Sequence, residues 1–159
     1  MLTINLICVG KIKEKFFRDA IDEYLKRLSR YCKLEITELP DEKIPNNPSE
    51  KNIEAIKEKE GNNIIAHIKS NSFVVCLDLA GKQYTSEELA VELDNLSLDY
   101  SHLTFIIGGS LGLSNKVLDS SNKLLSFSKL TFPHQLIRVF LLEQIYRCFK
   151  ISNGETYHK

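Results

Sequence analysis

The sequence lacks the features that would place it in several specialised classes of protein. No run of about 18 apolar residues is present, so no membrane-spanning helix is expected. The 21 basic and 21 acidic side chains cancel, which argues against a highly basic nucleic-acid-binding domain. The motifs G-x-G-x-x-G and G-x-x-x-x-G-K-[S/T] are both absent. This absence disfavours a Rossmann-type dinucleotide fold and a P-loop nucleoside triphosphatase.

The cysteines form no metal-binding or redox motif. Cys8, Cys32, Cys76 and Cys148 are widely separated, with no C-x-x-C pair and no histidine at metal-ligand spacing. Two of them lie within apolar runs, where a free thiol behaves as a small hydrophobe. We therefore expect buried, reduced cysteines and no metal site. The N-terminal apolar run precedes its charged residues, the reverse of a secretory signal, so we expect a cytoplasmic protein.

What is present is an alternation of apolar runs and amphipathic segments. Short runs rich in β-branched residues predict strands over 2–9, 34–39, 73–79, 103–107 and 123–127. Helical spacing predicts helices between them, with Ser49, Thr85 and Ser114 as caps and a bend at Gly61. Near-continuous apolar strands are typical of a parallel-rich sheet with helices on both faces. The length favours one α/β domain over residues 1–159.

The segment from Leu124 to Ile151 contains the most apolar helix of the chain. Pro133 suits the first turn of this helix, and apolar residues then occupy nearly every side of it. We expect the sheet to cover one side and a second copy of the protein to cover the other, which predicts a homodimer. Residues 124–159 also hold five basic and two acidic side chains. An anionic partner would meet this basic segment, although chance unevenness explains the charges equally well.

Candidate ligand-binding positions follow three predicted strands, because ligands of open α/β sheets bind beyond the carboxyl ends of the strands. These ends read LDLAG from Leu77, IGGS from Ile107 and FSKLT from Phe127. Glycines there let a ligand approach the backbone, whose N–H groups are donors. On its own, the pair of glycines after Ile107 is more typical of a tight turn. His134 is as well suited to bond the backbone as to do chemistry.

Several motifs together resemble one family. VGKIKEKFF, LDLAGK, FIIGGSLGL, LSFSKLTFPHQLIRV, LEQIYR and the terminal YHK occur in this order along essentially the whole chain. They resemble the SPOUT-class methyltransferase H family of the ribosomal large subunit. The resemblance implies methyl transfer from S-adenosylmethionine to N3 of a pseudouridine in 23S ribosomal RNA. It also implies a C-terminal trefoil knot, which general rules of chain topology would have excluded.

The resemblance assigns site residues at the same three strand ends. The residues it implies for cofactor binding are Leu77, Gly108, Phe127, Ser128, Lys129, Leu130, Thr131 and Phe132. It implies catalytic roles for Arg147, Tyr157 and His158. Chemistry suggests that Arg147 stabilises developing charge or a phosphate, that Tyr157 holds the base, and that His158 accepts a proton. Without the resemblance, a terminal YHK would be typical of a frayed tail.

Neutral net charge constrains the substrate, because phosphate neutralisation supplies most non-specific affinity for RNA. We therefore expect the substrate to be an assembled large subunit or a whole ribosome, recognised by shape, rather than free RNA. Two other classes stay open: a cofactor-free module that binds RNA or the ribosome, and an unrelated small-molecule enzyme. Binding of S-adenosylmethionine discriminates against the first class, and methylation of ribosomal RNA against the second.

Overall fold

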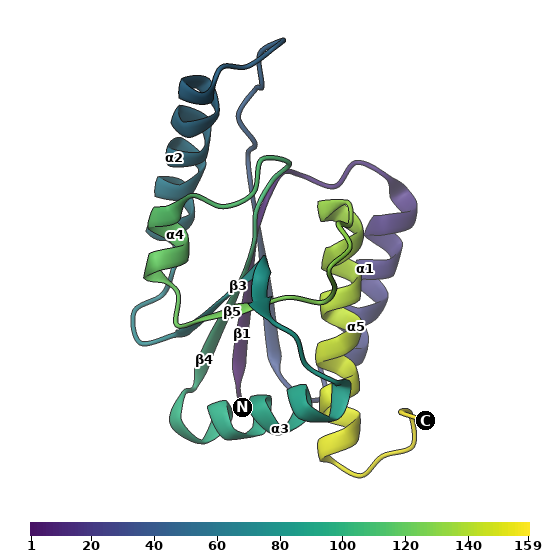
Figure 1. Ribbon diagram of the computed structural model, residues 1–159. Coiled ribbons are helices and arrows are strands. Elements are labelled where there is room, and N and C mark those ends of the chain that lie inside the picture. The colour runs from purple at the N-terminus through teal and green to yellow at the C-terminus, as the bar shows by residue number, and fades with distance from the viewer.

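A computed structural model describes residues 1–159, and five strands form a single sheet in it (Figure 1). The strand order is β2-β1-β4-β3-β5, and every pairing is parallel. The strands are β1 (Thr3–Val9), β2 (Lys33–Leu39), β3 (Phe73–Lys82), β4 (His102–Ile107) and β5 (Lys123–Leu125). The parallel sheet predicted from the apolar runs is therefore confirmed. All carboxyl ends of the strands lie at one edge of the sheet, which is the upper edge in Figure 1.

The edge next to β5 differs from the prediction at two strand ends. β3 extends three residues beyond residue 79, and β5 ends at Leu125 rather than at 127. The extension is stabilised by pairing, because Lys82 lies opposite Leu125 and accepts a hydrogen bond from Ser126 N at 3.0 Å. Gly81 permits this close approach: a Cβ there would lie 2.6 Å from the backbone of Leu125. The residues after Leu125 leave the sheet and form the loop that leads to α5.

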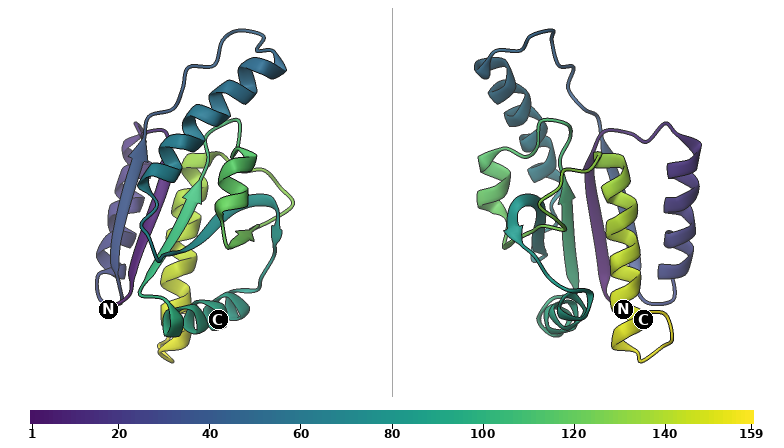
Figure 2. Two further views of the ribbon diagram at one scale, coloured as in Figure 1. Left: turned by 90° about the vertical axis from the view of Figure 1, so that its left-hand side faces the viewer. Right: turned by 45° about the vertical axis from the view of Figure 1, so that its right-hand side comes forward.

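Helices cover both faces of the sheet, as predicted. One face carries α2 (Glu50–His67) and α4 (Asn115–Ser120), and the other carries α1 (Lys15–Leu28), α3 (Ser86–Asp99) and α5 (His134–Ser152), as Figure 2 shows. The three predicted caps are confirmed, since Ser49, Thr85 and Ser114 each accept a hydrogen bond from the backbone three residues later. No helix is both long and apolar enough to cross a membrane. The four cysteines are free and buried.

The bend expected at Gly61 was wrong, because α2 runs without interruption from Glu50 to His67. Gly61 serves packing instead. A Cβ at this position would lie 2.5 Å from Ser114 Oγ and 3.1 Å from a methyl group of Val117. The glycine therefore lets α2 lie directly against α4.

The reason given for a homodimer also needs correction. α5 packs between α1 and α3 within a single chain, so most of its apolar surface is covered without a second copy (Figure 1). Tyr146, for example, packs at a tilt against Tyr24 and edge-on against Tyr31 of the α1 region, at centroid distances of 6.3 and 6.1 Å. Phe140, which is 38% exposed, is the only large apolar side chain of α5 that is left open. The homodimer itself stays a prediction, and so does the trefoil knot.

Candidate active site

A cavity of about 710 Å³ lies at the carboxyl edge of the sheet. Its walls come from the ends of β3 and β4 and from the loop between β5 and α5, which are the three strand ends singled out in the sequence. Its size falls within the range of small-molecule and cofactor sites. Residues distant in the sequence thus form one concave site.

Seven of the eight residues that the resemblance assigned to the cofactor line this cavity: Leu77, Gly108, Phe127, Ser128, Leu130, Thr131 and Phe132. The eighth, Lys129, is exposed and does not contribute to the lining. The three strand ends chosen in the sequence did not include Leu113, Ser126 or Ile137, which also line the cavity. Their positions beside the strand ends are the only sequence signal that would have found them.

The pair of glycines after β4 leads into a tight turn, as one of its two explanations predicted, while the approach of a ligand to this backbone stays a prediction. Gly109 and Gly112 form a tight turn, in which Gly112 N donates to Gly109 O at 3.0 Å and Gly112 has a φ of +81°. The same turn lines the cavity. A Cβ at Gly108 would lie 3.0 Å from the backbone of Gly112, so any side chain at this position would have to project into the cavity or displace the turn.

The first turn of α5 is fixed to the sheet by a buried arginine that the sequence did not reveal. Arg138 is 1% exposed, and its Nη2 donates to the carbonyl oxygens of Val9 and Gly10 at 2.9 Å each. Its Nη1 pairs with Glu38 Oε2 at 3.2 Å. Burial alone would raise the pKa of Glu38, but hydrogen bonds from Ile12 N and the Arg18 guanidinium, with the nearby Arg138, lower it overall. The carboxylate therefore stays charged and holds α5 against β1 and β2.

His134 lies at the rim of the cavity, one turn before Arg138. Burial, with the adjacent Arg138 charge, lowers the pKa of this histidine. Gly10, with a φ of +96°, passes so close that a Cβ there would lie 3.3 Å from His134 Cε1. His134 is thus a neutral side chain between the cavity and the end of β1.

A second cavity of about 300 Å³ adjoins the first and shares Leu125, Ser126, Phe127 and Phe132 with it. Phe140, Ser86, Glu143 and Gln144 also line it. It therefore combines aromatic faces with hydrogen-bonding groups, the composition that a nucleobase requires.

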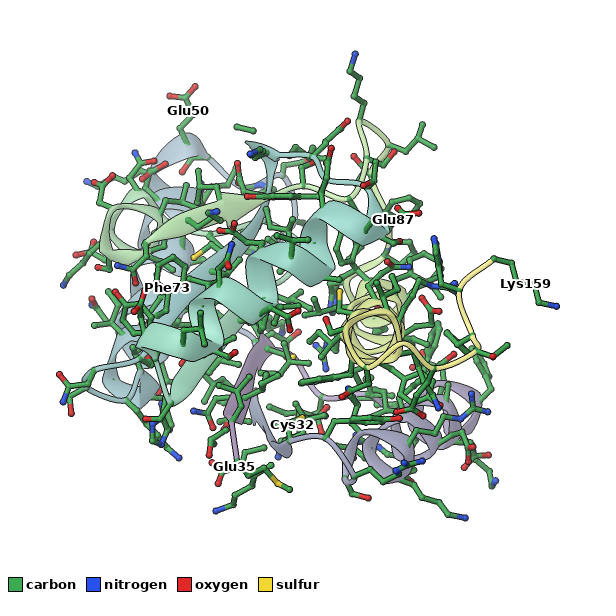
Figure 3. The ribbon with its side chains drawn as sticks, turned by 90° about the horizontal axis from the view of Figure 1, so that it is seen from below. Cys32, Glu35, Glu50, Phe73, Glu87 and Lys159 are labelled. Atoms are coloured by element: carbon green, nitrogen blue, oxygen red, sulfur yellow. The ribbon has the colours of Figure 1, made fainter.

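The three residues predicted to be catalytic come together at the other end of α5. Arg147 Nη1 lies 3.2 Å from His158 Nδ1, and the Arg147 guanidinium lies 4.7 Å from the centroid of the Tyr157 ring. Glu143 joins them, accepting hydrogen bonds from Arg147 Nε at 3.0 Å and from Tyr157 OH at 3.1 Å. His158 Nε2 is 2.7 Å from Glu87 Oε1. Figure 3 shows Glu87 at the start of α3, on the side where the C-terminal tail runs to Lys159.

The tail is therefore folded, and its surroundings change its chemistry. Burial and the charge of Glu143 raise the pKa of Tyr157 to about 12, so its hydroxyl stays protonated. The hydrogen bond to Glu143 raises the pKa of Arg147 further, so it stays a cation. Glu87 has a lowered pKa, first because of its backbone hydrogen bond and then because of His158. Neither Glu87 nor Glu143 was assigned a role from the sequence. Glu87 lies 71 positions from His158, whereas Glu143 lies only four positions before Arg147.

The cluster predicted to be catalytic and the large cavity are separated within one chain. Arg147, Tyr157 and His158 line neither cavity, and only Glu143 connects them to the smaller one. Arg147 lies thirteen positions after His134 on α5, which corresponds to about 20 Å at the rise of an α-helix.

The family is established by comparison with known proteins. The family described as "Predicted SPOUT methyltransferase" matches residues 2–158, and the chain belongs to the SPOUT methyltransferase family. A solved structure titled as a probable methylase family protein from Haemophilus influenzae Rd KW20 has the same fold, with a TM-score of 0.53 at 13% identity. The alignment covers 99% of this chain and 70% of that one.

Closer relatives narrow the similarity within the family. The chain is 62% identical over 159 residues to the Ribosomal RNA large subunit methyltransferase H of Clostridium beijerinckii, covering 99% of this chain and all of the relative. It is 60% identical, with the same coverage, to the protein of that name from Clostridium novyi. The resemblance inferred from the motifs is therefore confirmed.

Proposed function

We propose that the chain, acting as a single domain over residues 1–159, methylates N3 of a pseudouridine in 23S ribosomal RNA with S-adenosylmethionine as the methyl donor. One observation carries the proposal: seven residues that the resemblance assigns to the cofactor line one cavity. Relatives that match along the whole chain are named large-subunit ribosomal RNA methyltransferases. Because the substrate is the ribosome, we expect the protein in the cytoplasm.

The large cavity fits the chemistry of the proposed cofactor. Leu77, Leu130 and Phe132 supply apolar surface for adenine, and the strand ends supply backbone donors and acceptors for its polar edge. Ser128 is already committed to shaping the loop, since its hydroxyl accepts a hydrogen bond from Leu130 N at 3.1 Å. The loop therefore binds with its backbone, and Lys129 takes part through its main chain alone.

When bound, the sulfonium supplies an activated methyl group, so the residues of the chain must orient the base and remove its N3 proton. The smaller cavity would hold the base between aromatic faces. Arg147 would stabilise negative charge on the base carbonyls, and Tyr157, which stays protonated, would donate a hydrogen bond to it. His158 would accept the proton, because a neutral imidazole nitrogen can act as a general base.

A homodimer resolves the separation between the cofactor cavity and the catalytic cluster. Reacting atoms must approach to about 3–3.5 Å, whereas the two ends of α5 are far apart in one chain. Three exposed apolar side chains surround the cavities, namely Leu79 at 60%, Leu130 at 68% and Phe140 at 38% exposure. A two-fold axis beside Phe140 would cover them and pack two α5 helices antiparallel. The end of α5 in one subunit would then meet the cavity of the other.

Two measurements test the assembly and the activity. Light scattering at micromolar concentration is expected to give a dimer, and a monomer would remove the two-subunit active site. Ribosomes from cells lacking the gene are incubated with the protein and S-adenosylmethionine, and their 23S nucleosides are analysed by mass spectrometry. We expect N3-methylpseudouridine with intact large subunits or whole ribosomes, and little with a short RNA hairpin. A protein that binds ribosomes without binding the cofactor would be a binding module instead.

A further inference from the structure

The motif VGKIKEKFF contributes to the family resemblance, but none of its residues lines either cavity. It forms the end of β1, a short loop and the first turn of α1. We propose that the loop and Phe16 form a contact surface for ribosomal RNA, in which Lys11 and Lys13 bind phosphates and Phe16 stacks on an unpaired base. This inference rests on the proposed function, because it assigns the surface to the same ribosomal substrate.

The loop is held in one conformation rather than left mobile. Ile12 is buried, at 7% exposure, and its N–H donates to Glu38 Oε2 at 2.8 Å. Arg18 Nη2 donates to the Ile12 carbonyl at 3.2 Å and to Glu38 Oε1 at 2.8 Å. Because Ile12 points inward, Lys11 and Lys13 on either side of it are exposed. Their charges are therefore carried on a fixed backbone, which reduces the entropy lost on binding.

These two lysines have no partner in the protein. Lys11 and Lys13 form no ion pair, whereas Lys15 pairs with Asp19 and Arg18 pairs with Glu38. Glu14 is the only acidic residue between positions 11 and 18. The loop thus presents two uncommitted cations to solvent. Such charges are available to neutralise phosphates.

Phe16 is an exposed aromatic ring among these charges. It is 67% exposed, and its only aromatic neighbour is Phe17, at a centroid distance of 4.4 Å and an interplanar angle of 50°. Phe17 packs against the core and so supports Phe16 from behind. A ring supported on one side and open on the other, beside lysines, is the arrangement that stacks on the bases of single-stranded nucleic acid.

The surface lies next to the proposed active site. Gly10, which precedes Lys11, packs against His134 at the rim of the large cavity. In Figure 1 the chain leaving β1 emerges at the edge of the sheet where α5 begins. A nucleotide extruded toward the cavities would leave its flanking RNA close to this loop. The combination of cations and an aromatic ring favours RNA as the partner. A protein partner would bury the two unpaired lysines.

The test measures binding to purified large subunits as a function of salt, separately from methyl transfer. We expect Lys11→Ala/Lys13→Ala to weaken binding about tenfold at physiological salt and to reduce the slope of log K against log salt by about 1.5. Phe16→Leu is expected to weaken binding about tenfold, while Phe16→Tyr keeps the stacking ring and stays within about twofold. Lys26→Ala, which removes an exposed lysine without an ion pair near the end of α1, serves as the control for loss of a lysine outside the loop.

Cofactor affinity and light scattering are measured on the same variants, and both are expected to be unchanged. The inference is overturned if the double variant binds subunits with the affinity and salt slope of the wild type. It is also overturned if Phe16→Leu dissociates the dimer, which would make Phe16 a subunit contact. Failure of the wild type to methylate ribosomes, despite normal binding, would instead refute the proposed function and leave the binding surface supported.

Discussion

The two ends of α5 differ in the types of residue that surround them. Its first turn lies against a cavity of backbone, glycine and apolar side chains, and the buried Arg138–Glu38 pair fixes it to the sheet. Its last turns carry a network of charged and aromatic side chains that extends into the C-terminal tail. Two regions of one helix thus differ in burial and in charge.

This difference suggests that the first end binds the cofactor and that the second end contributes to turnover. The first end has the rigidity and shape that selective cofactor binding requires, since Arg138 fixes it to β1 and β2. At the second end, side chains hold the tail: Glu143 accepts a hydrogen bond from Tyr157, and Glu87 pairs with His158. Changes at the first end should therefore affect binding, and changes at the second should affect turnover.

The largest effect is expected at Gly108. Gly108→Arg places a long side chain where a Cβ already meets the turn at Gly112, so it should abolish cofactor binding measured by calorimetry. The dimer and the melting temperature should change little if the side chain projects into the cavity. Unchanged cofactor affinity would show that the cavity is not the binding site.

At the other end, removal of Tyr157 to Lys159 should reduce kcat by about 100-fold or more, because it removes the proposed general base. Cofactor affinity should be unchanged, since none of these residues lines the large cavity. His158→Ala should reproduce most of the loss, whereas His67→Ala, which alters an exposed histidine on α2, should not. Normal methylation by the truncated protein would contradict a catalytic role for the tail.

The third change tests the rigidity of the first end. Glu38→Gln removes the anion that faces the buried Arg138, and we expect a loss of about 3 kcal/mol in the free energy of unfolding. Because the folded-state pKa of Glu38 is lowered, its contribution is complete above the ordinary value of 4.5 and is lost as the pH falls below it. The difference between wild type and variant in urea denaturation should therefore narrow in acid.

A matched control lies on the same strand. Glu35→Gln alters an exposed carboxylate whose partners, Lys33 and Lys69, are also exposed, so its effect on stability should be much smaller. If both variants lost the same free energy of unfolding, burial of Arg138 would not strengthen the contribution of its pair with Glu38 to stability.

The smallest effect is expected at Lys129. Its side chain is exposed and outside the lining of the cavity, although it lies in the cofactor loop. Lys129→Ala should change cofactor affinity by no more than about twofold, as expected for a surface substitution. A larger loss would show that the lysine folds over the bound cofactor.

Local chemistry made much of the fold predictable from the sequence. The capping box at Thr85 and Glu88 fixed the start of α3, and the apolar run from Leu103 to Ile107 marked a buried strand. These signals act over a few residues, so they are visible in a single sequence. The positions of the cavity-lining strand ends followed from the general behaviour of parallel sheets.

Features that depend on distant residues were not predictable in the same way. The apolar residues of α5 show that the helix is buried. They do not show whether α1 and α3 or a second copy of the protein covers it. Gly61 was expected to bend α2. Its packing role was not visible, because its neighbour Ser114 lies more than fifty positions away in the sequence. Glu87, which lies 71 positions from its partner His158, was missed for the same reason.

We propose that the two ends of α5, from different subunits, form one active site. Co-expression of Gly108→Arg subunits with subunits lacking Tyr157 to Lys159, carrying two different affinity tags, yields heterodimers that can be purified through both tags. Neither parent homodimer should methylate ribosomes. We expect the heterodimer to regain methyl transfer, because one of its sites combines an intact cavity with an intact tail. A stable heterodimer with no activity would contradict it.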